Sequence, residues 1–231
     1  MREERIGYHV TKRAFDVAAS ALGLVVTSPV WLAAVIGIEL SDPGPVFYMA
    51  NRVGYHNTPF RMFKFRSMRV DNQANEKSFR ADAGRIFPWG AFMRNTKIDE
   101  LPQLLNVFLG DMSVVGPRPA SVDQAAITRG GKYAQVGSVK PGLSGPSALY
   151  DYIYGDTITD ETEYQRLVLP TRMELDRYYI SNACWKLDGK MIAWTVGCIA
   201  NSLFRRSSGG MLEKLISWAE SMEEQTWTKK D

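Results

Sequence analysis

The sequence predicts a mainly helical protein of the mixed α/β class, with an N-terminal membrane helix and a small domain containing short strands. Residues 17–38 carry no charge, short apolar segments between turn-forming residues begin at residue 46, and longer segments with helical spacing follow. A chain of 231 residues suits one domain plus a membrane anchor. We place the membrane segment in residues 1–40, the domain in residues 41–204 and an amphipathic tail in residues 205–231.

The composition excludes several classes of protein. The 28 basic and 25 acidic residues give a net charge of +3, which is too balanced for the basic surface expected of a nucleic-acid binder. Cys184 and Cys198 are the only cysteines, and His9 and His56 the only histidines. Neither a disulfide framework nor a Cys/His zinc site is therefore predicted, and the cysteine content is typical of a reducing compartment.

The uncharged run over residues 17–38 is long enough for a membrane helix, which needs about 20 apolar residues. A cleaved signal peptide fits poorly, because the run is long and Asp16 follows Lys12 and Arg13 at its entrance. A buried core helix of a soluble protein is the other alternative.

Thr27, Ser28 and Pro29 interrupt the middle of the run, where the proline should bend the helix. Basic residues flank the run on both sides, whereas a helix that spans the bilayer should have its basic residues biased to one side. A re-entrant helix that enters and leaves on one face explains this balance. A large soluble domain after a spanning helix also explains it, so the pattern leaves both topologies open.

Residues 41–45 are rich in turn formers, and residues 46–49 then predict a short strand. Residues 60–68 alternate apolar and basic side chains, which predicts either a strand with a cationic face or a charge-protected edge strand. Residues 71–82 are polar and predict a loop or an exposed helix. Helices are predicted over residues 101–108 and 161–180, and turns at residues 116–119 and 141–142.

Two apolar segments near the C-terminus, residues 191–204 and 211–218, are too short to span a membrane. Tryptophan and basic residues flank them, as in amphipathic helices that lie in the membrane interface. Ordinary packing of amphipathic helices on the core is the alternative.

The adjacent carboxylates Asp99 and Glu100 precede the apolar helix predicted at residue 101. With Asp99 as the N-cap, Pro102 falls in the first turn, where its missing N–H costs nothing. Neighbouring positions on a helix point about 100° apart, so separate roles are expected, with one carboxylate attacking phosphorus and the other orienting it, binding metal or handling protons. A capping aspartate followed by a surface glutamate is the structural alternative.

Basic residues are frequent around the turns and this acidic pair, and they could stabilise the charge on phosphate oxygens during phosphoryl transfer. They are Arg52, Lys64, Arg66, Arg94, Lys97, Arg118 and Lys140. The sequence contains neither the phosphate loop of kinase-like enzymes nor the glycine-rich dinucleotide turn of Rossmann enzymes.

These motifs, in this order and spacing, resemble the bacterial sugar transferases known as monotopic polyprenyl-phosphate phosphoglycosyl transferases. The similarity covers roughly residues 12–196. Its main motifs are Lys12-Arg13-x-x-Asp16, Ser28-Pro29, Gly44-Pro45-Val46, Arg52-x-Gly54, Lys64-Phe65-Arg66-Ser67-Met68, Asp99-Glu100-Leu101-Pro102-Gln103-Leu104, Gly110-Asp111-Met112-Ser113, Gly116-Pro117-Arg118-Pro119 and Lys140-Pro141-Gly142.

The resemblance implies a re-entrant helix broken at Ser28 and Pro29, in a bacterial inner membrane, with the active site facing the cytoplasm. Asp99 would attack the donor phosphate, release a nucleoside monophosphate and carry a covalent phosphosugar, which polyprenyl phosphate would then accept. Mg²⁺ would bind at Asp99 with Glu100. The predicted phosphate-binding residues are Lys64, Arg66, Arg94, Arg118 and, from the group of basic residues, Lys140.

The sequence departs from the family after Gly142, where many members continue with a Trp-Ala-Gln-Val-type stretch. Residues 143–156 therefore replace the usual nucleotide-binding segment in a way that the sequence does not define. Larger relatives carry a preceding membrane domain, and with 11 residues before Lys12 this chain is expected to be the short, single-domain form.

The predicted partners are a nucleotide diphosphate sugar, most simply a UDP-sugar, polyprenyl phosphate and the bilayer, and a homodimer is left open. Two other functions share the same residues: a catalytically silent membrane scaffold, and a magnesium phosphohydrolase that uses water as acceptor.

Overall fold

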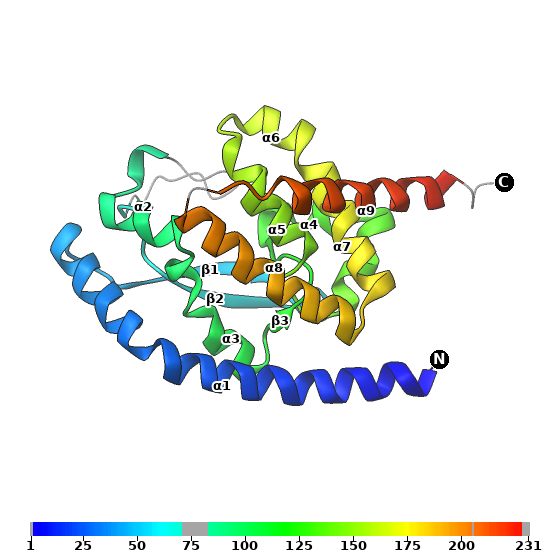
Figure 1. Cartoon of the computed structure of the whole chain (residues 1–231), viewed down its shortest axis with the longest axis horizontal. Helices are drawn as coiled ribbons and strands as arrows, with labels where there is room; N and C mark the ends of the chain where they lie inside the picture. Colours follow the sequence, from blue (N-terminus) through cyan, green and yellow to red (C-terminus); the bar gives the residue numbers. More distant parts are fainter. Residues whose placement is uncertain (1, 71–82, 205, 228–231) are drawn as a thin grey trace.

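The structure is a computed structural model that describes residues 2–70, 83–204 and 206–227 (Figure 1). It confirms a mainly helical α/β protein with small sheets. The helices are α1 (Arg2–Ser41), α2 (Pro88–Asn95), α3 (Gln103–Leu109), α4 (Ala125–Thr128), α5 (Pro146–Ile153), α6 (Glu161–Leu167), α7 (Leu169–Asn182), α8 (Trp185–Leu203) and α9 (Gly209–Trp227). The strands are β1 (Phe47–Val53), β2 (Pro59–Phe65), β3 (Ser113–Val115), β4 (Ala120–Ser121) and β5 (Gly142–Ser144).

Helix α1 runs along one edge of the molecule and bends in its second half (Figure 1). Its helical structure is continuous through Ser28 and Pro29, so the helix bends, as predicted from the proline, but is not broken at these residues as the resemblance implied. Pro29 has no N–H for the carbonyl of Val25, four residues earlier, and the Ser28 hydroxyl donates to that oxygen instead at 2.8 Å. The pair therefore allows a bend without leaving a carbonyl unsatisfied in an apolar helix.

Most of α1 presents apolar side chains outward. Residues 7–41 are long and apolar enough to cross a membrane, with a mean hydropathy of 2.1 in the most apolar window, of which only 11% is buried. Because a core helix would bury this window, the alternative of a buried soluble helix is wrong. The most exposed apolar residues of this part of α1 are Val10, Leu22, Val25, Val26, Leu32 and Leu40.

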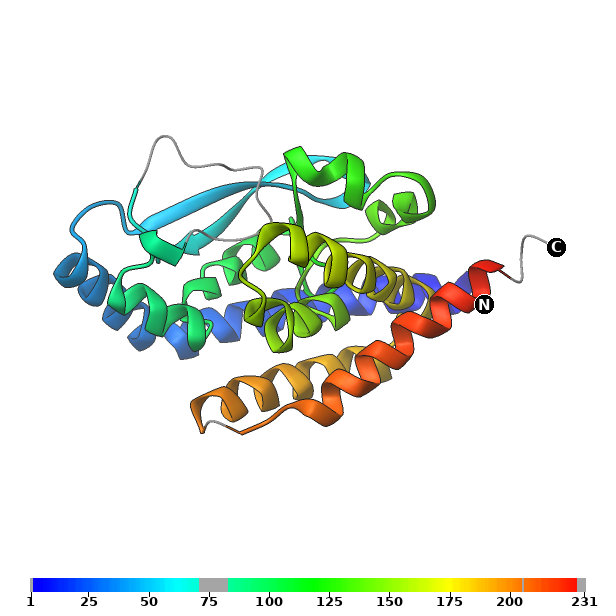
Figure 2. The same ribbon diagram turned by 90° about the horizontal axis from the view of Figure 1, so that it is seen from above.

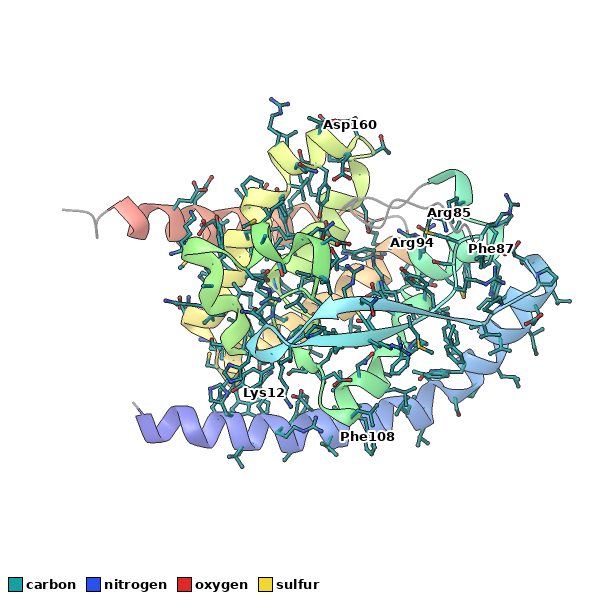
Figure 3. All side chains as sticks on the ribbon, turned by 180° about the vertical axis from the view of Figure 1, so that it is seen from behind. Lys12, Arg85, Phe87, Arg94, Phe108 and Asp160 are labelled. Atoms are coloured by element: carbon teal, nitrogen blue, oxygen red, sulfur yellow. The ribbon has the colours of Figure 1, made fainter. Side chains whose placement is uncertain are left out.

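The part of α1 that precedes the apolar run is attached to the domain through polar contacts. The ammonium of Lys12, which points from α1 toward the domain (Figure 3), donates to Asp188 of α8 at 2.6 Å. Arg13 donates to the carbonyls of Val107 and Phe108 at the end of α3. The basic residues that precede the apolar run therefore attach α1 to the domain.

The buried carboxylate of Asp16 extends this attachment to the first residues of β3. It accepts hydrogen bonds from the Ser113 hydroxyl at 3.0 Å and from the Val114 N–H at 2.9 Å. The membrane helix therefore positions the strand that leads to Gly116-Pro117-Arg118.

Two small sheets occur within the described residues. Strands β1 and β2 form an antiparallel hairpin, and β4 pairs with the end of β1 at Arg52 and Val53, in the order β2-β1-β4. The predicted strands at residues 46–49 and 60–68 are thus confirmed with shifted ends. The prediction of one cationic face is wrong, because side chains alternate along a strand. Arg61 and Lys64, three positions apart, therefore lie on opposite faces of β2.

Strands β3 and β5 form a parallel pair, with Ser113 opposite Gly142 and Val115 opposite Ser144. Residue 142 therefore begins a strand rather than lying in the predicted turn. The backbones approach closely, since a Cβ on Gly142 would lie 2.1 Å from the nitrogen of Gly116. The lack of a side chain at Gly116 and Gly142 therefore allows the two chain segments to approach this closely.

Gly142→Ala is expected to destabilise the protein by about 1–3 kcal/mol, because the added methyl meets backbone that cannot rotate away. In a chain of this size the melting temperature should fall by about 2–4 °C per kcal/mol, measured by thermal unfolding in detergent. Gly189→Ala in α8 is the matched control, since nothing lies within 4 Å of its added Cβ. Equal melting temperatures for the two variants would contradict the close approach.

The C-terminal half forms the largest core. In Figure 2 the β1–β2 hairpin lies on one side of the molecule and helices α8 and α9 on the other, with α5 and α7 between them. Leu215, Trp218 and Ala219 of α9 are buried in this core, together with Leu175 and Tyr179 of α7. The apolar side of residues 211–218 is therefore used for ordinary packing.

In the segment predicted at residues 191–204, residues 191–203 belong to α8, which buries Met191 and Cys198. Val196, Leu203 and the following Phe204 are exposed. The helix predicted over residues 161–180 is two helices, α6 and α7, divided at Val168. Pro170 follows this division, in the first turn of α7, where its missing N–H is tolerated. The prediction for residues 71–82 lies outside the described residues.

Candidate active site

Asp99 and Glu100 lie in a tight turn between α2 and α3. Lys97 adopts a left-handed conformation (φ 58°), and residues Ile98–Glu100 then form a single 3₁₀ turn. Helix α3 begins at Gln103 with Pro102 as its N-cap, so the prediction that Asp99 caps this helix is wrong. The proline fits because its fixed φ continues the chain from the 3₁₀ turn into the helix.

The side chain of Asp99 is buried and under-satisfied. It is only 4% exposed, and its Oδ1 has no hydrogen-bond partner among the described residues. Burial raises the pKa of this carboxyl, and the nearby Glu100 adds to the effect, while Lys64, Arg94 and Lys97 oppose it. A buried carboxylate oxygen without a partner is costly, which indicates a site that is completed by a ligand.

Glu100 has a different environment from its neighbour. Lys64 of β2 donates to its Oε1 at 2.9 Å. Burial alone would raise the pKa of Glu100, but the charges of Lys64, Lys97 and Arg118 outweigh burial and lower it well below its usual range. The two adjacent carboxylates therefore differ in the way expected of groups with separate roles.

A cavity opens beside this turn. Its lining includes Glu100 from the turn, Gln103 of α3 and Leu143 just after the start of β5, but not Asp99 itself. The charged residues of its wall are Arg52, Lys64, Arg118, Arg172, Glu100 and Asp151. With four cationic side chains against two carboxylates, the cavity suits an anionic ligand.

Arg118 is held in this wall by both its backbone and its side chain. Its N–H donates to Asp176 Oδ1 at 3.1 Å and to the Ser147 hydroxyl at 3.3 Å. Its Nε lies 3.0 Å from Asp151 Oδ2. Burial alone would lower the pKa of Arg118, but Asp151 and Glu100 raise it above its usual value, so this guanidinium is always charged.

Asp151 is fixed in turn by α6 and α7. The Tyr164 hydroxyl donates to its Oδ1 at 2.6 Å, and Arg172 donates to that hydroxyl oxygen at 2.7 Å. The charges of Arg118 and Arg172 lower the pKa of Asp151 against the effect of its burial. Sequence reasoning missed both Asp151 and Arg172, because no local motif links them to the acidic pair.

The segment at residues 143–156, whose role the sequence left open, supplies part of this site. Besides Leu143 and Asp151 it contributes Asp156, whose carboxylate lies 3.4 Å from the ammonium of Lys97. The same ammonium lies 4.1 Å from the centre of the Tyr152 ring. This segment thus contacts the turn that carries Asp99 as well as the cavity.

Not all of the predicted phosphate-binding residues come together. Lys64 and Arg118 line the cavity, and Arg94 of α2 (Figure 3) is close enough for its charge to act on Asp99. Arg66 lies elsewhere, paired with Asp42 and donating to the Pro45 carbonyl. Its position after β2 turns its side chain back toward the end of α1.

Lys140 also lies apart from the cavity. A Cβ built on Gly110 would lie 3.2 Å from a guanidinium nitrogen of Arg13 and 3.4 Å from the ammonium of Lys140, so these two cations are neighbours near the end of α3. Burial and the charge of Arg13 lower the pKa of Lys140. The prediction that Lys140 binds substrate phosphate therefore gains no support from the site.

The acidic pair suits Mg²⁺, which needs few protein ligands, better than it suits a metal ion that is held by protein side chains alone. Within residues 2–70, 83–204 and 206–227 no group of three or more His, Cys, Asp or Glu side chains is arranged to hold a metal. Mg²⁺ is usually bound by one or two carboxylates together with substrate phosphates. The unpartnered Oδ1 of Asp99, next to Glu100, meets that requirement.

Comparison with known proteins identifies the family to which the chain belongs. The sequence profile of a family described as bacterial sugar transferase matches residues 7–202, which is most of the chain. This chain belongs to the bacterial sugar transferase family. Membership confirms the resemblance stated from the motifs, together with the predicted transferase class.

Curated relatives agree with this assignment. An N-acetylgalactosaminephosphotransferase of Aeromonas hydrophila, named for UDP-N-acetylgalactosamine and undecaprenyl phosphate, is 36% identical over 83% of this chain and 44% of its own length. The UDP-glucose:undecaprenyl-phosphate glucose-1-phosphate transferase of Escherichia coli (strain K12) is 34% identical over 80% of this chain and 39% of its own length. This sugar transferase thus spans less than half of these two relatives.

A shorter relative matches over most of its length. The uncharacterized sugar transferase EpsL of Bacillus subtilis (strain 168) is 36% identical over 81% of this chain and 86% of its own length. The matched region therefore also occurs in proteins that consist of little else.

Proposed function

We propose that this sugar transferase moves a sugar-1-phosphate from a UDP-sugar to undecaprenyl phosphate, as a membrane step in the assembly of a surface glycan. The observation that carries the proposal is the buried Asp99, with an unpartnered carboxylate oxygen, beside a cavity whose charged wall residues are mostly cationic. The names of the relatives support the donor and acceptor classes, since they include UDP-N-acetylgalactosamine, UDP-glucose and undecaprenyl phosphate.

The reaction would proceed in two displacements at one phosphorus. In the first, the Asp99 side chain turns toward the cavity and its carboxylate attacks the phosphorus that carries the sugar. The bond from that phosphorus to the bridging oxygen breaks, its electron pair stays on this oxygen, and UMP leaves. In the second, an oxygen of undecaprenyl phosphate attacks the same phosphorus and Asp99 leaves as a carboxylate.

No net proton is gained or lost in this sequence, which suits a site without a histidine in its wall. Lys64 and Arg118 would stabilise charge on the phosphate oxygens through both steps, and Arg94 would help to keep Asp99 ionised. Asp99 and Glu100 would hold Mg²⁺, which supplies further neutralisation of phosphate charge when it is bound.

The bilayer contact is assigned to α1. We propose that it enters and leaves on the cytoplasmic face of the bacterial inner membrane. The bend in its second half, the half that contains Pro29, and its exposed apolar face support this placement. The contacts of Lys12, Arg13 and Asp16 with the domain would keep the cavity near the membrane surface, where a lipid-linked phosphate is accessible.

The test is a product assay with the purified protein in nanodiscs, with Mg²⁺ and separately with UDP-glucose and UDP-N-acetylgalactosamine. UMP and a diphosphate-linked lipid sugar are expected in equal amounts, and continued UMP release should require undecaprenyl phosphate. Turnover without the lipid would indicate a phosphohydrolase. Failure to release UMP from any donor in a wider panel of nucleotide sugars would favour the scaffold.

A further inference from the structure

The wall of the cavity contains Arg52, which belongs to the basic residues noted in the sequence but was not among the predicted phosphate-binding residues. Arg52 lies in β1, and its side chain reaches the wall that also contains Lys64 and Arg118. Lys64 faces Tyr48 across the hairpin, and positions 48 and 52 lie on the same face of β1, because side chains alternate along a strand. Arg52 and Lys64 therefore project from the same face of the sheet.

Arg52 and Lys64 lie at different positions along the hairpin, because Lys64 pairs with Tyr48 and Arg52 pairs with Phe60. Arg52 lies four positions after Tyr48 in the sequence, which is about 13 Å along β1. Lys64 marks the end of the cavity next to Glu100 and Asp99, through its 2.9 Å contact with Glu100. Arg52 enters at the other end, where β1 pairs with Ser121 of β4 shortly after Arg118.

The carboxylates of the wall are engaged by other cations. Glu100 accepts from Lys64, and Asp151 pairs with Arg118 while accepting from the Tyr164 hydroxyl. Within the part of the chain that the structure describes, Arg52 forms no salt bridge, and its Nε is buried without a hydrogen-bond partner. Burial lowers the pKa of Arg52, and the charges of Arg118 and Arg172 lower it further.

A guanidinium in this position is stabilised by an incoming anion, which would satisfy its donors and relieve the repulsion from neighbouring arginines. A nucleotide diphosphate sugar brings two phosphates. The one that carries the sugar must lie at the end next to Asp99. The other phosphate, which carries the nucleoside, then extends away from Asp99 toward the end of the cavity that Arg52 lines.

We infer that Arg52 binds the nucleoside-bearing phosphate of the donor and holds it as it leaves as UMP, an assignment that rests on the proposed transferase reaction. When the bond to the bridging oxygen breaks, its electron pair adds negative charge to this phosphate. A fork of guanidinium N–H donors is suited to that charge, because it can contact two phosphate oxygens at once. Arg52 is a binding residue for the leaving group, separate from the residues around Asp99.

The test measures UMP binding by isothermal titration calorimetry on the full chain in nanodiscs, with uridine as the ligand that lacks the phosphate. Arg52→Met is expected to weaken UMP binding by about 10- to 100-fold, the effect of losing hydrogen bonds to a charged group. Uridine binding should be unchanged. Arg52→Lys keeps the charge but not the fork, so a smaller loss is expected.

Arg61→Met is the matched control, since Arg61 is an exposed arginine of the same hairpin on its opposite face. It should leave UMP binding unchanged, and the melting temperatures of all variants should agree with that of the wild type. In steady-state assays, Arg52→Met should raise KM for the donor and the inhibition constant of UMP, but not KM for undecaprenyl phosphate.

The outcomes separate this inference from the proposed function. Wild-type turnover combined with unchanged UMP binding in Arg52→Met would overturn the role of Arg52 alone. A rise in KM for undecaprenyl phosphate without a loss of UMP binding would assign Arg52 to the acceptor and equally overturn it. Absence of both UMP binding and turnover in the wild type would overturn the proposed function together with this inference.

Discussion

Replacing Asp99 by asparagine is expected to abolish product formation, with a loss of at least about 10⁴-fold in kcat, the scale seen when an enzyme loses its nucleophile. The asparagine amide has nearly the same shape, but it cannot form the acyl phosphate intermediate. The burst of UMP in a single turnover without lipid acceptor should also disappear. This burst is measured by rapid quench with a labelled donor.

Asp123→Asn is the control for this experiment, since Asp123 is an exposed aspartate outside the cavity. It should keep wild-type kinetics. The covalent intermediate itself can be trapped on the wild-type protein by acid quench and located by mass spectrometry of the peptide that contains residue 99. A phosphosugar on another residue, or a full burst in Asp99→Asn, would contradict the assignment of the nucleophile.

Glu100→Gln is expected to give the second largest loss, roughly 100-fold in kcat at fixed Mg²⁺, on the scale of losing one group that stabilises the transition state or metal. The substitution removes the carboxylate partner of Lys64, whose ammonium now lies 2.9 Å from Glu100. Lys64 would then interact more strongly with Asp99 and compete with the metal for it. Raising the Mg²⁺ concentration should therefore restore part of the activity.

The measurement is the Mg²⁺ dependence of initial rates after treatment with EDTA, for wild type and variant. The variant curve should move to higher Mg²⁺ concentration. Glu163→Gln, in the exposed first turn of α6, is the matched control and should leave the curve in place. Full activity of the wild type in EDTA would rule out a metal requirement, and an unshifted curve for Glu100→Gln would remove Glu100 from the metal site.

The membrane helix and the candidate site are parts of one structural unit. Asp16 holds the first residues of β3, and β3 leads directly to Arg118. At the other end of α1, Ala34 and Ile38 are buried with Phe65, the last residue of β2, one position after Lys64. Disturbing α1 is therefore expected to affect two of the elements that carry cations into the cavity, β2 with Lys64 and the segment after β3 with Arg118.

Several features were determined by the sequence alone, because they depend on residues that are close together in the chain. The apolar run at residues 17–38 predicted the long helix, and the mainly helical α/β class followed from local periodicity. The spacing of the motifs was sufficient to recognise the family. Asp99 and Glu100 could also be selected, since an acidic pair before an apolar helix is a local pattern.

Local pattern was not sufficient for the exact backbone at this pair. The same residue types are compatible with an N-cap followed directly by a helix and with a 3₁₀ turn followed by a helix. The second arrangement is found here, after Lys97 in a left-handed conformation. The resemblance likewise implied a helix broken at Ser28 and Pro29, whereas the helix is continuous there and the Ser28 hydroxyl satisfies the carbonyl that the proline leaves free. In both cases single hydrogen bonds or dihedral angles, which composition does not specify, determined the outcome.

Only the tertiary structure decided which charged residues share the site. Arg66 stands two residues from Lys64 but pairs with Asp42 near the end of α1, whereas Arg172, far along the chain, lines the cavity with Lys64. Sequence distance carries no information about this, because side-chain direction and long-range packing bring the groups together. The sequence determined that this protein has a membrane helix, an acidic pair and an excess of cations. The packing of β1, β2, β3 and α7 determined which cations line the cavity beside that pair.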